Sequence, residues 1–487
     1  MKRINNIVLL LTFCGLSSGQ PVMLHPDNPH YFLFTGKTMA IVSSGEHYGA
    51  VINPDFDYLK YLNTLQKEGM IYTRIFTGTY FEREGSFGIQ KNTLAPAPGR
   101  QLIPWKRSSE PGAICGGNKF DLEQWDEDYF SRLRSFVAEA SKRGIIVEIS
   151  LFTSIYGYWD IQPWNSKNNI NLNKDITKEK IQTLNNGPVL KYQENLVRKI
   201  VREMNEFDNV IYEIQNEPWA DHPLTATQKS EYFSRQDFAQ EGAEWRNKVD
   251  LADQASLDWQ KKIASFIADE ETRLKKRHLI AQNYCNFYYP VTEVDPNVSI
   301  MSFHYDYPVV VEQNYAWNRV ISFDESGFAG TEDVTYRKQA WNFIIAGGGL
   351  FNNLDYSFAA GEEDGKAVNK APGGGSTNLR KQLATLSGFI NSFDLVKMKA
   401  DYEVIIQSPG VFARALSEPG KQYAIYIHNG SKCNLILNLP AGKYSVEWVS
   451  TKADGSKVTE KIDHRGGRIL IQSPDYIEDI ALKIVRI

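Results

Sequence analysis

The segment Val210-Ile-Tyr-Glu-Ile-Gln-Asn-Glu-Pro-Trp219 decides how the rest of this chain is interpreted. It begins as an apolar run typical of a β-strand and ends at Asn216-Glu217-Pro218. Because proline cannot donate to a strand ladder, the strand is expected to stop there and to leave Glu217 at the carboxyl edge of its sheet. A second apolar run starts at Arg319 and ends in the same way, at Glu325-Ser326-Gly327. Two glutamates at strand ends predict a site that holds a pair of carboxyl groups.

Predicted strands and helices alternate on both sides of this segment. The predicted strands cover residues 38–42, 70–76, 144–152, 210–217, 278–283, 298–303, 319–325 and 348–355. The predicted helices cover residues 55–68, 128–142, 189–206, 250–277, 331–346 and 378–393, with weaker helices after the fifth and sixth strands. Eight strand-then-helix units in an α/β chain imply a parallel sheet that closes into a (β/α)8 TIM barrel.

The chain is predicted to enter this barrel through a hairpin. Residues 30–34 and 38–42 flank the turn Thr35-Gly36-Lys37, and the second run is expected to continue as the first barrel strand. The long irregular segments follow predicted strands; they are residues 77–120, 153–188, 219–248 and 357–377. Strand-to-helix loops build the functional face of a barrel, so we expect the site on the face that carries these segments.

The pattern changes after about Asp394. Short alternating runs separated by turns such as Asn429-Gly430 predict a small C-terminal β-sandwich. The expected domain organisation is therefore a leader at 1–19, a barrel with its N-terminal hairpin at 20–395 and a β-sandwich at 396–487.

The first residues have the pattern of a signal peptide. Lys2-Arg3 precede an apolar run from Ile7 to Leu16, and small residues follow at 17–19. A buried N-terminal strand or helix is the alternative. Removal of the leader leaves Cys115, Cys285 and Cys433, an odd number, so we do not expect disulfides to hold the fold. We expect a secreted or periplasmic protein.

Composition excludes two classes of partner. The chain has 487 residues and a net charge of −4 without charge blocks, so it lacks the basic surface that nucleic-acid binding requires. Beyond the leader, the sequence has no apolar run long enough for a membrane span.

The eight histidines show no metal-ligand spacing, and Gly-x-Ser-x-Gly is absent, which argues against a metal centre and a serine nucleophile.

The two strand ends resemble the signatures of the clan A retaining glycoside hydrolases. The motifs are Asn216-Glu217-Pro218 and Asp324-Glu325-Ser326-Gly327, and the resemblance covers roughly residues 30–395. It implies that Glu217 is the acid/base, that Glu325 is the nucleophile and that Asn216 binds the sugar 2-hydroxyl, without a cofactor. Arg74 resembles the clan's second-strand arginine, which holds the nucleophile ionised. His304, with Tyr305 or Tyr307, resembles the clan's histidine and aromatic residue beside the nucleophile.

The sequence departs from the cellulase-like pattern at the eighth strand, where Leu354-Asp355-Tyr356 stands in place of a sugar-stacking tryptophan. Tyr356 is therefore a candidate for substrate contact. Further candidates follow predicted strands; they are Glu46, His47, Trp159 and Trp219. A satisfied structural pair is the alternative for the first two, and loop packing is the alternative for Trp159 and its neighbours Tyr156, Tyr158 and Trp164.

Retaining cleavage requires two carboxyl groups about 5–5.5 Å apart, with distinct roles. The nucleophile must be ionised, which Arg74 favours, and the acid must be protonated, which predicts a less polar setting for Glu217 or a like charge near it. Glu213 lies four residues before Glu217 and is expected below the barrel mouth. The resulting hypothesis is hydrolysis of a β-linked glycoside with retention. The alternatives are transglycosylation or phosphorolysis at the same site, carbohydrate binding on a decayed barrel, and adhesion led by the β-sandwich.

Overall fold

The computed structural model describes residues 19–173, 175–227, 248–368 and 373–487. The expected signal peptide at 1–19 lies outside this range except for its last residue. None of the helices in the described segments combines the length and the apolar character that crossing a membrane requires.

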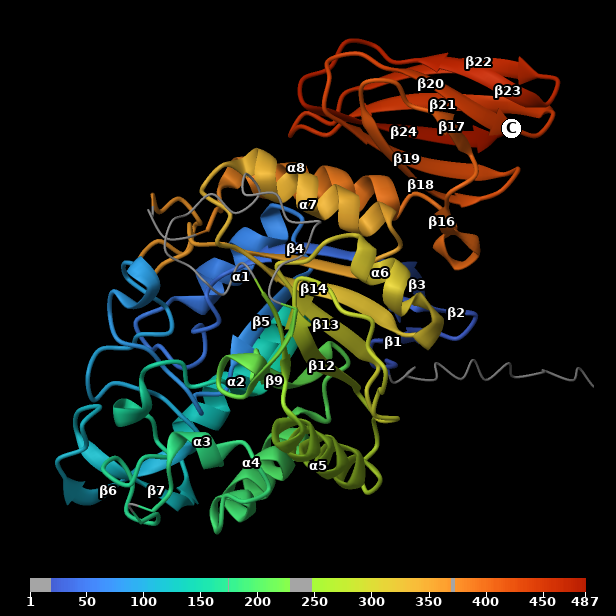
Figure 1. Ribbon diagram of the computed structural model, residues 1–487. Coiled ribbons are helices and arrows are strands. Elements are labelled where there is room, and N and C mark those ends of the chain that lie inside the picture. Colours follow the sequence, from blue (N-terminus) through green and yellow to red (C-terminus); the bar gives the residue numbers. More distant parts are fainter. Residues whose placement is uncertain (1–18, 174, 228–247, 369–372) are drawn as a thin grey trace, which may run out of the picture.

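Eight parallel strands form a nearly closed barrel, as predicted (Figure 1). They are β4 (Ile41–Gly45), β5 (Tyr72–Phe76), β8 (Ile146–Thr153), β9 (Val210–Asn216), β12 (Leu279–Asn286), β13 (Ile300–His304), β14 (Val320–Ser326) and β15 (Leu350–Leu354). Neighbouring strands pair in chain order from β5 round to β15, and β15 pairs with β4. Two further hydrogen bonds draw β4 and β5 together: Ser43 Oγ donates to Tyr72 O at 2.6 Å, and Phe76 N donates to Tyr48 O at 2.9 Å.

Helices follow most of these strands and cover the outside of the barrel. They are α1 (Tyr58–Lys67), α2 (Glu127–Lys142), α3 (Lys178–Ile181), α4 (Val189–Met204), α5 (Gln254–Glu271), α6 (Val309–Asn314), α7 (Asp333–Ile345) and α8 (Thr377–Ile390). Features of the sequence account for where these helices begin and end. In α2, for example, the Asp126 carboxylate caps the amides of Asp128 and Tyr129, and a buried face including Leu133 and Phe136 turns toward the barrel.

Two of the predicted helices differ from the structure. Residues 287–299 after the fifth strand form no helix, and residues 250–252 belong to β11 (Val249–Ala252) rather than to α5. β11 pairs with β10 (Pro223–Thr227) and lengthens the sheet beside β12. The loop after β5 carries a second hairpin, β6 (Trp105–Pro111) and β7 (Asn118–Trp125).

The N-terminal sheet covers the amino end of the barrel. It consists of β1 (Met23–His25), β2 (Asn28–Phe34) and β3 (Lys37–Met39), and the predicted second hairpin strand breaks at Ala40 before the barrel begins. Phe32 and Phe34 of this sheet form one buried cluster with residues at the starts of the barrel strands, such as Ile41 and Ile300. Since this end is filled, the carboxyl ends of the strands remain for a site.

The C-terminal region is a β-sandwich, as predicted. One antiparallel sheet contains β16 (Lys399–Asp401), β18 (Phe412–Glu418), β19 (Gln422–His428), β24 (Asp479–Arg486), β21 (Gly442–Ser450) and β22 (Lys457–His464). The other contains β17 (Ile405–Gln407), β20 (Asn434–Leu439) and β23 (Gly467–Gln472). The sequence did not predict β22, because this edge strand is charged and mostly exposed, which hides its alternation.

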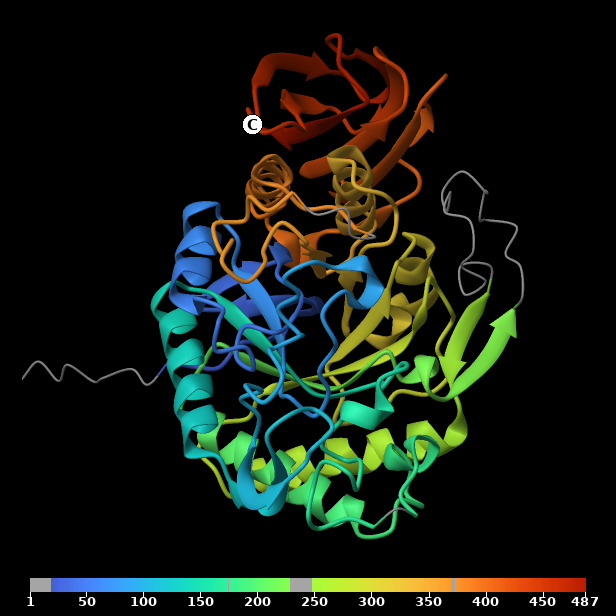
Figure 2. The same cartoon turned by 90° about the vertical axis from the view of Figure 1, so that its left-hand side faces the viewer.

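The sandwich rests on α7 and α8, the gold and orange helices beneath the red domain in Figure 2. Trp341 of α7 stacks on Tyr426 of β19 with ring centres 5.4 Å apart. Beside it, buried Arg337 donates to both carboxylate oxygens of buried Asp479. The joint therefore combines apolar packing with a desolvated ion pair, which fixes the sandwich next to the loops that follow β13 and β14.

Candidate active site

Glu217 is held at the end of β9 in a strained conformation. Its φ of 48° lies in the left-handed region, which costs a side-chain-bearing residue about 1–2 kcal/mol. Asn283 Oδ1 accepts the Glu217 amide at 3.0 Å, and Ser154 Oγ donates to its carbonyl at 2.7 Å. Pro218 then begins a short turn of 3₁₀ helix. The neighbouring strands therefore impose the conformation that projects this carboxylate.

Glu325, in β14, projects from another side of the same mouth. One oxygen of Glu325 and one oxygen of Glu217 lie within 4.8 Å of each other, and both side chains are almost wholly buried. The structure thus brings together the two strand-end glutamates that the sequence singled out.

Glu325 receives three hydrogen bonds. Tyr48 donates to its Oε2 at 2.8 Å, Arg74 Nη1 donates to the same oxygen at 3.2 Å, and Tyr305 donates to its Oε1 at 2.7 Å. All three donors are buried. Hydrogen bonds from a guanidinium and from phenols favour the ionised carboxylate.

Arg74 is the centre of a buried charge network. Its guanidinium binds both oxygens of Glu213, with Nε to Oε2 at 2.9 Å, and Nη2 also donates to Asn216 Oδ1 at 2.8 Å. Asp324 and Glu148 lie 3.8 Å from Nε. Glu213 therefore lies below the mouth, as expected, but it shares the arginine that reaches Glu325.

The excess of acids over cations in this network raises some of their pKa values. Burial, and then the charges of Glu213 and Asp324, raise the pKa of Glu148 well above its usual value. Burial raises the pKa of Glu213 to about 7 despite the opposing charge of Arg74. These shifts favour the neutral forms of Glu148 and Glu213, as a low-dielectric interior does for acids in excess of cations.

Glu217 has different partners. His304 Nδ1 lies 2.9 Å from Glu217 Oε1, and Tyr156 donates to Glu217 Oε2 at 2.7 Å. On its other side, His304 Nε2 lies 3.5 Å from Asp324. His304 thus links the glutamate at the mouth to the acid cluster below it.

This pairing gives Glu217 a pKa opposite to the one the sequence led us to expect. Burial alone would raise the pKa of Glu217, but the hydrogen bond and charge of His304 outweigh it and hold the pKa below its usual value. Burial would lower the pKa of His304, but the charges of Glu325 and Asp324 raise it well above the usual value. Both shifts favour a carboxylate paired with an imidazolium.

Two adjoining cavities surround the carboxylate pair. The inner cavity, about 50 Å³, contains both glutamates and is walled by His47, Tyr48, Glu82 and Tyr356 among others. The outer cavity, about 340 Å³, contains Glu217 and is lined by Trp219, Ala220, Pro223, Lys248, Asp250 and Asn286. Phe87, Tyr156, Tyr305 and Phe328 line both cavities.

Backbone strain is concentrated around these cavities. Twelve described non-glycine residues have a positive φ, and half of them line the two cavities; these are Tyr48, Phe87, Tyr156, Glu217, Tyr305 and Phe328. Such strain persists only where the surrounding structure imposes it, and it gathers at functional sites. The conformations of these residues support the same location for the site as the carboxylates do.

The other residues predicted from the sequence divide into two groups. Asn216, His47, Trp219 and Tyr356 line the cavities together with the glutamates. Asn216 donates to Tyr156 Oη at 2.8 Å, and Trp219 packs edge-on against His304. His47 Nδ1 and Tyr356 Oη are buried and have no hydrogen-bond partner among the described residues, so they are available to a ligand.

The remaining three have other surroundings. The Glu46 carboxylate accepts the amides of Gly49 and Ala50, both at 3.0 Å, and so stabilises the turn after β4. Trp159 packs against the hydrophobic core from the loop after β8. Tyr307 packs on Phe287 beside the mouth, and it is Tyr305 whose hydroxyl reaches Glu325.

Sequence reasoning did not single out several residues of the site. Tyr48 follows the first strand directly, in the stretch Glu46-His47-Tyr48, so its position after a strand end was a usable signal. Glu82, Phe87 and Phe328 come from long loops, and no local pattern marks them. Glu82 accepts a hydrogen bond from Asn92 at 2.5 Å and lies 3.3 Å from His47 Nε2, which places a carboxylate at the far end of the inner cavity.

Among the described residues, two groups of side chains have ligand atoms close enough for a metal ion. They are Glu213, His304 and Asp324, and Glu217, His304 and Glu325, each with ligand atoms within 4.8 Å. Both use His304, and Arg74 already binds Glu213 and Glu325 with its fixed positive charge. The residues therefore fit an internally paired charge network better than a divalent ion, which needs His304 neutral.

No protein-family model matches this chain, and no curated protein matches its sequence. Solved structures share its fold. A protein described as a glycoside hydrolase aligns over 96% of this chain and 97% of its own, with a TM-score of 0.60 and 12% identity. A candidate glycoside hydrolase from Bacteroides vulgatus aligns over 97% and 83%, with a TM-score of 0.64 and 13% identity. A family 5 glycoside hydrolase from the same organism aligns over 96% and 93%, with a TM-score of 0.60 and 12% identity.

Proposed function

We propose that this chain is a retaining glycoside hydrolase that cleaves a β-linked glycoside in an oligo- or polysaccharide. One observation carries the proposal: two buried strand-end glutamates have oxygens within 4.8 Å of each other and differ in their closest hydrogen-bond partners. This separation suits the retaining geometry, whereas inverting pairs stand about 6.5–9.5 Å apart to admit a water molecule. The fold that the chain shares with glycoside hydrolase structures supports it.

In the first step, Glu325 attacks the anomeric carbon while Glu217 protonates the departing glycosidic oxygen. Tyr48, Tyr305 and Arg74 hold Glu325 as a carboxylate and aim it. The carbon–oxygen bond to the leaving sugar breaks as the bond to Glu325 forms, which gives a glycosyl ester. In the second step, Glu217 takes a proton from water, the water oxygen attacks the same carbon, and Glu325 leaves.

His304 supplies the proton that Glu217 needs in the first step. At 2.9 Å from Glu217, its Nδ1–H can pass a proton to the carboxylate when the glycosidic oxygen is in place to accept it. Glu217 and His304 thus share one proton before the reaction begins. As the ester forms, Glu325 loses its negative charge, one of the charges that raise the pKa of His304, so the pair gives up its proton to the leaving oxygen more readily in that same step.

Asn216 is positioned to contact the sugar next to the reacting carbon. Its side-chain oxygen accepts from Arg74 and its amide donates to Tyr156, so its orientation is fixed from both sides. His47, Glu82 and Tyr356 would receive the far hydroxyls of the sugar in the inner cavity, and Trp219 would face the leaving group in the outer cavity. We further propose that the protein is secreted or periplasmic, where such substrates occur.

The test is release of sugar from a panel of plant and microbial glycans by the wild type, Glu217→Gln, Glu325→Gln and the exposed control Glu460→Gln. Loss of general acid catalysis should reduce kcat/KM by about 10²–10⁴-fold in Glu217→Gln, and Glu325→Gln should be at least as damaged. The control should retain full activity. NMR of the first-formed anomer would then identify retention.

Two results would refute the proposal. Cleavage that survives both substitutions would remove the assigned residues from the chemistry. Glycan binding without cleavage, unchanged in both variants, would instead identify a carbohydrate-binding protein on a barrel that has lost its activity.

A further inference from the structure

A cleft of about 510 Å³ separates the barrel mouth from the β-sandwich. Its barrel wall is formed by residues 305–308 after β13, by residues 327–329 after β14 and by one side of α7. Its other wall belongs to the sandwich and includes Phe412 and His428. Figure 1 shows β18 and β19, which carry these two residues, above α6 and α7.

The cleft contains buried polar atoms that lack partners. Asp306 is 5% exposed, and neither of its carboxylate oxygens has a hydrogen-bond partner of standard geometry among the described residues. The side-chain oxygen of Gln339 is buried and likewise without a partner in that part of the chain. An unmade hydrogen bond of this kind costs about 1–3 kcal/mol, and a ligand with several hydroxyl donors would recover it.

An aromatic platform lies opposite these polar atoms. Phe412 is 65% exposed and stacks on His428 with ring centres 5.2 Å apart and planes inclined by 18°. Burial lowers the pKa of His428, so the ring beneath Phe412 is neutral. A large aromatic face turned to water on a strand gains from contact with an amphipathic ligand such as a sugar ring.

The cleft adjoins the active site. Tyr305 and Phe328 line the cleft as well as both cavities around the carboxylate pair. The Tyr305 hydroxyl is 2.7 Å from Glu325, and its ring packs edge-on against Phe328. A chain of sugars that starts at Glu325 can therefore pass over these two rings toward the sandwich.

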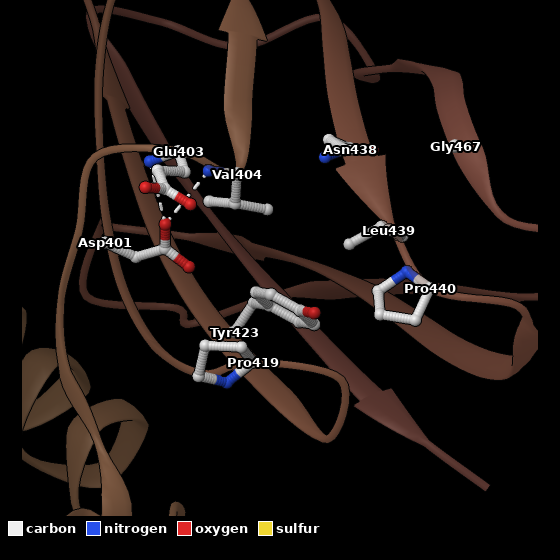
Figure 3. A pocket seen from close by; sticks show the side chains of 9 residues that line it. All are labelled: Asp401, Glu403, Val404, Pro419, Tyr423, Asn438, Leu439, Pro440 and Gly467. Atoms are coloured by element: carbon white, nitrogen blue, oxygen red, sulfur yellow. Dashed lines mark hydrogen bonds between the residues drawn. The ribbon is translucent and has the colours of Figure 1, made fainter.

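The sandwich has a cavity of its own, and it fits a ligand less well. Figure 3 shows this cavity of about 310 Å³ between the two sheets. Its acid, Asp401, already accepts the amides of Glu403 and Val404 and the hydroxyl of Ser417. The Asp401 carboxylate is thus used by the fold, whereas the Asp306 carboxylate and the Gln339 side-chain oxygen in the interdomain cleft have no such partners among the described residues.

We propose that the cleft between the barrel and the β-sandwich is a binding subsite for further sugar units of the oligosaccharide held at Glu217 and Glu325, with Phe412 as its stacking surface. Asp306 and Gln339 accept hydroxyl groups of the bound sugar. The inference rests on the proposed glycosidase function for its substrate class. It assigns the sandwich a direct part in substrate binding.

The experiment compares wild type with Phe412→Ala, Gln339→Leu and the control Tyr402→Ala. Tyr402 is 66% exposed on the same domain and does not line the cleft, so its removal matches the loss of an exposed aromatic residue. The probes are β-linked gluco-, manno- and xylo-oligosaccharides from disaccharide to hexasaccharide. The readouts are kcat/KM for each length and, separately, binding by calorimetry.

Wild type and Tyr402→Ala should gain kcat/KM and affinity as the oligosaccharide lengthens. For the longer oligosaccharides, kcat/KM and affinity of Phe412→Ala should be about three- to tenfold lower than those of wild type, and Gln339→Leu should be reduced by a similar factor. A length dependence and affinity in Phe412→Ala equal to wild type would overturn the proposal. If wild type cleaves nothing, the glycosidase proposal fails, but weaker binding by Phe412→Ala would still support the cleft. Absence of binding to every probe would overturn both.

Discussion

Two substitutions of Arg74 test separately what the charge and the shape of its guanidinium contribute. In the structure this side chain makes four hydrogen bonds: two to Glu213, one to Asn216 and one to Glu325. A lysine keeps the charge, but its single nitrogen cannot reach three acceptors around the mouth and loses at least two of these bonds. At about 1.5 kcal/mol for each bond to a charged or positioning group, the loss is about 3 kcal/mol. Arg74→Lys should therefore fold and lose about 10²-fold in kcat/KM.

Arg74→Met removes the charge as well. Glu213, Asp324 and Glu148 then remain buried without a fixed cation, so this variant should be destabilised by about 3–5 kcal/mol. Thermal unfolding followed by circular dichroism tests this expectation without knowledge of the substrate.

The matched control is Arg132→Lys, because Arg132 also uses its guanidinium on several acceptors, in this case backbone carbonyls of residues 50, 51, 53 and 56. It should lose stability without a comparable loss of kcat/KM. Activity of Arg74→Lys within threefold of wild type, or an Arg74→Met variant as stable as wild type, would refute the reasoning.

Three further predictions concern buried charges. Burial raises the pKa of Glu148 well above its usual value, so the folded state disfavours the ionised form at pH 7, a cost that a glutamine does not carry; Glu148→Gln should therefore be at least as stable as wild type, and a loss of unfolding free energy in denaturant titrations would contradict it. Arg337→Ala leaves Asp479 buried without its guanidinium, so it should cost about 3–5 kcal/mol and expose the domain joint to proteolysis, and unchanged protease resistance would count against this. Burial raises the pKa of Glu46 from 4.5 to about 7, so its contribution to stability is present below about pH 4.5 and is lost, by about 3 kcal/mol, as the pH rises to 7. Glu46→Gln should lack this part of the pH dependence, and an unchanged stability–pH curve would show that Glu46 does not titrate there.

The fold was predictable because its signals are local and repeated. Each barrel strand is an apolar run bounded by a turn, and the two strands that end in Glu217 and Glu325 locate the functional face by themselves. The secondary-structure prediction was wrong in segments that lack such signals. Residues 250–252 precede a strong helical pattern, and the predicted helix therefore included them. In the structure they pair with β10 and form a strand.

The candidate site was predictable only where a residue adjoins a strand end. Glu217, Glu325, Arg74 and His304 lie on or directly after strands, so their meeting at one mouth follows from barrel geometry. The hydrogen-bond partners of these residues could not be predicted from the sequence in the same way. Whether Tyr305 or Tyr307 reaches Glu325 depends on the left-handed turn at Tyr305, which no sequence pattern specifies.

In the proposed mechanism, the cation closest to each glutamate accounts for the different roles of the two similar strand ends. Glu325 accepts a hydrogen bond from Arg74, a fixed cation that does not release its proton. Glu217 faces His304, whose imidazolium can release its proton. In the proposed mechanism a lowered pKa of Glu217 in the free site is therefore compatible with an acid role, because the proton resides one hydrogen bond away. Sequence reasoning looked for an acid in a less polar setting or beside a like charge, whereas the structure supplies a proton-holding partner.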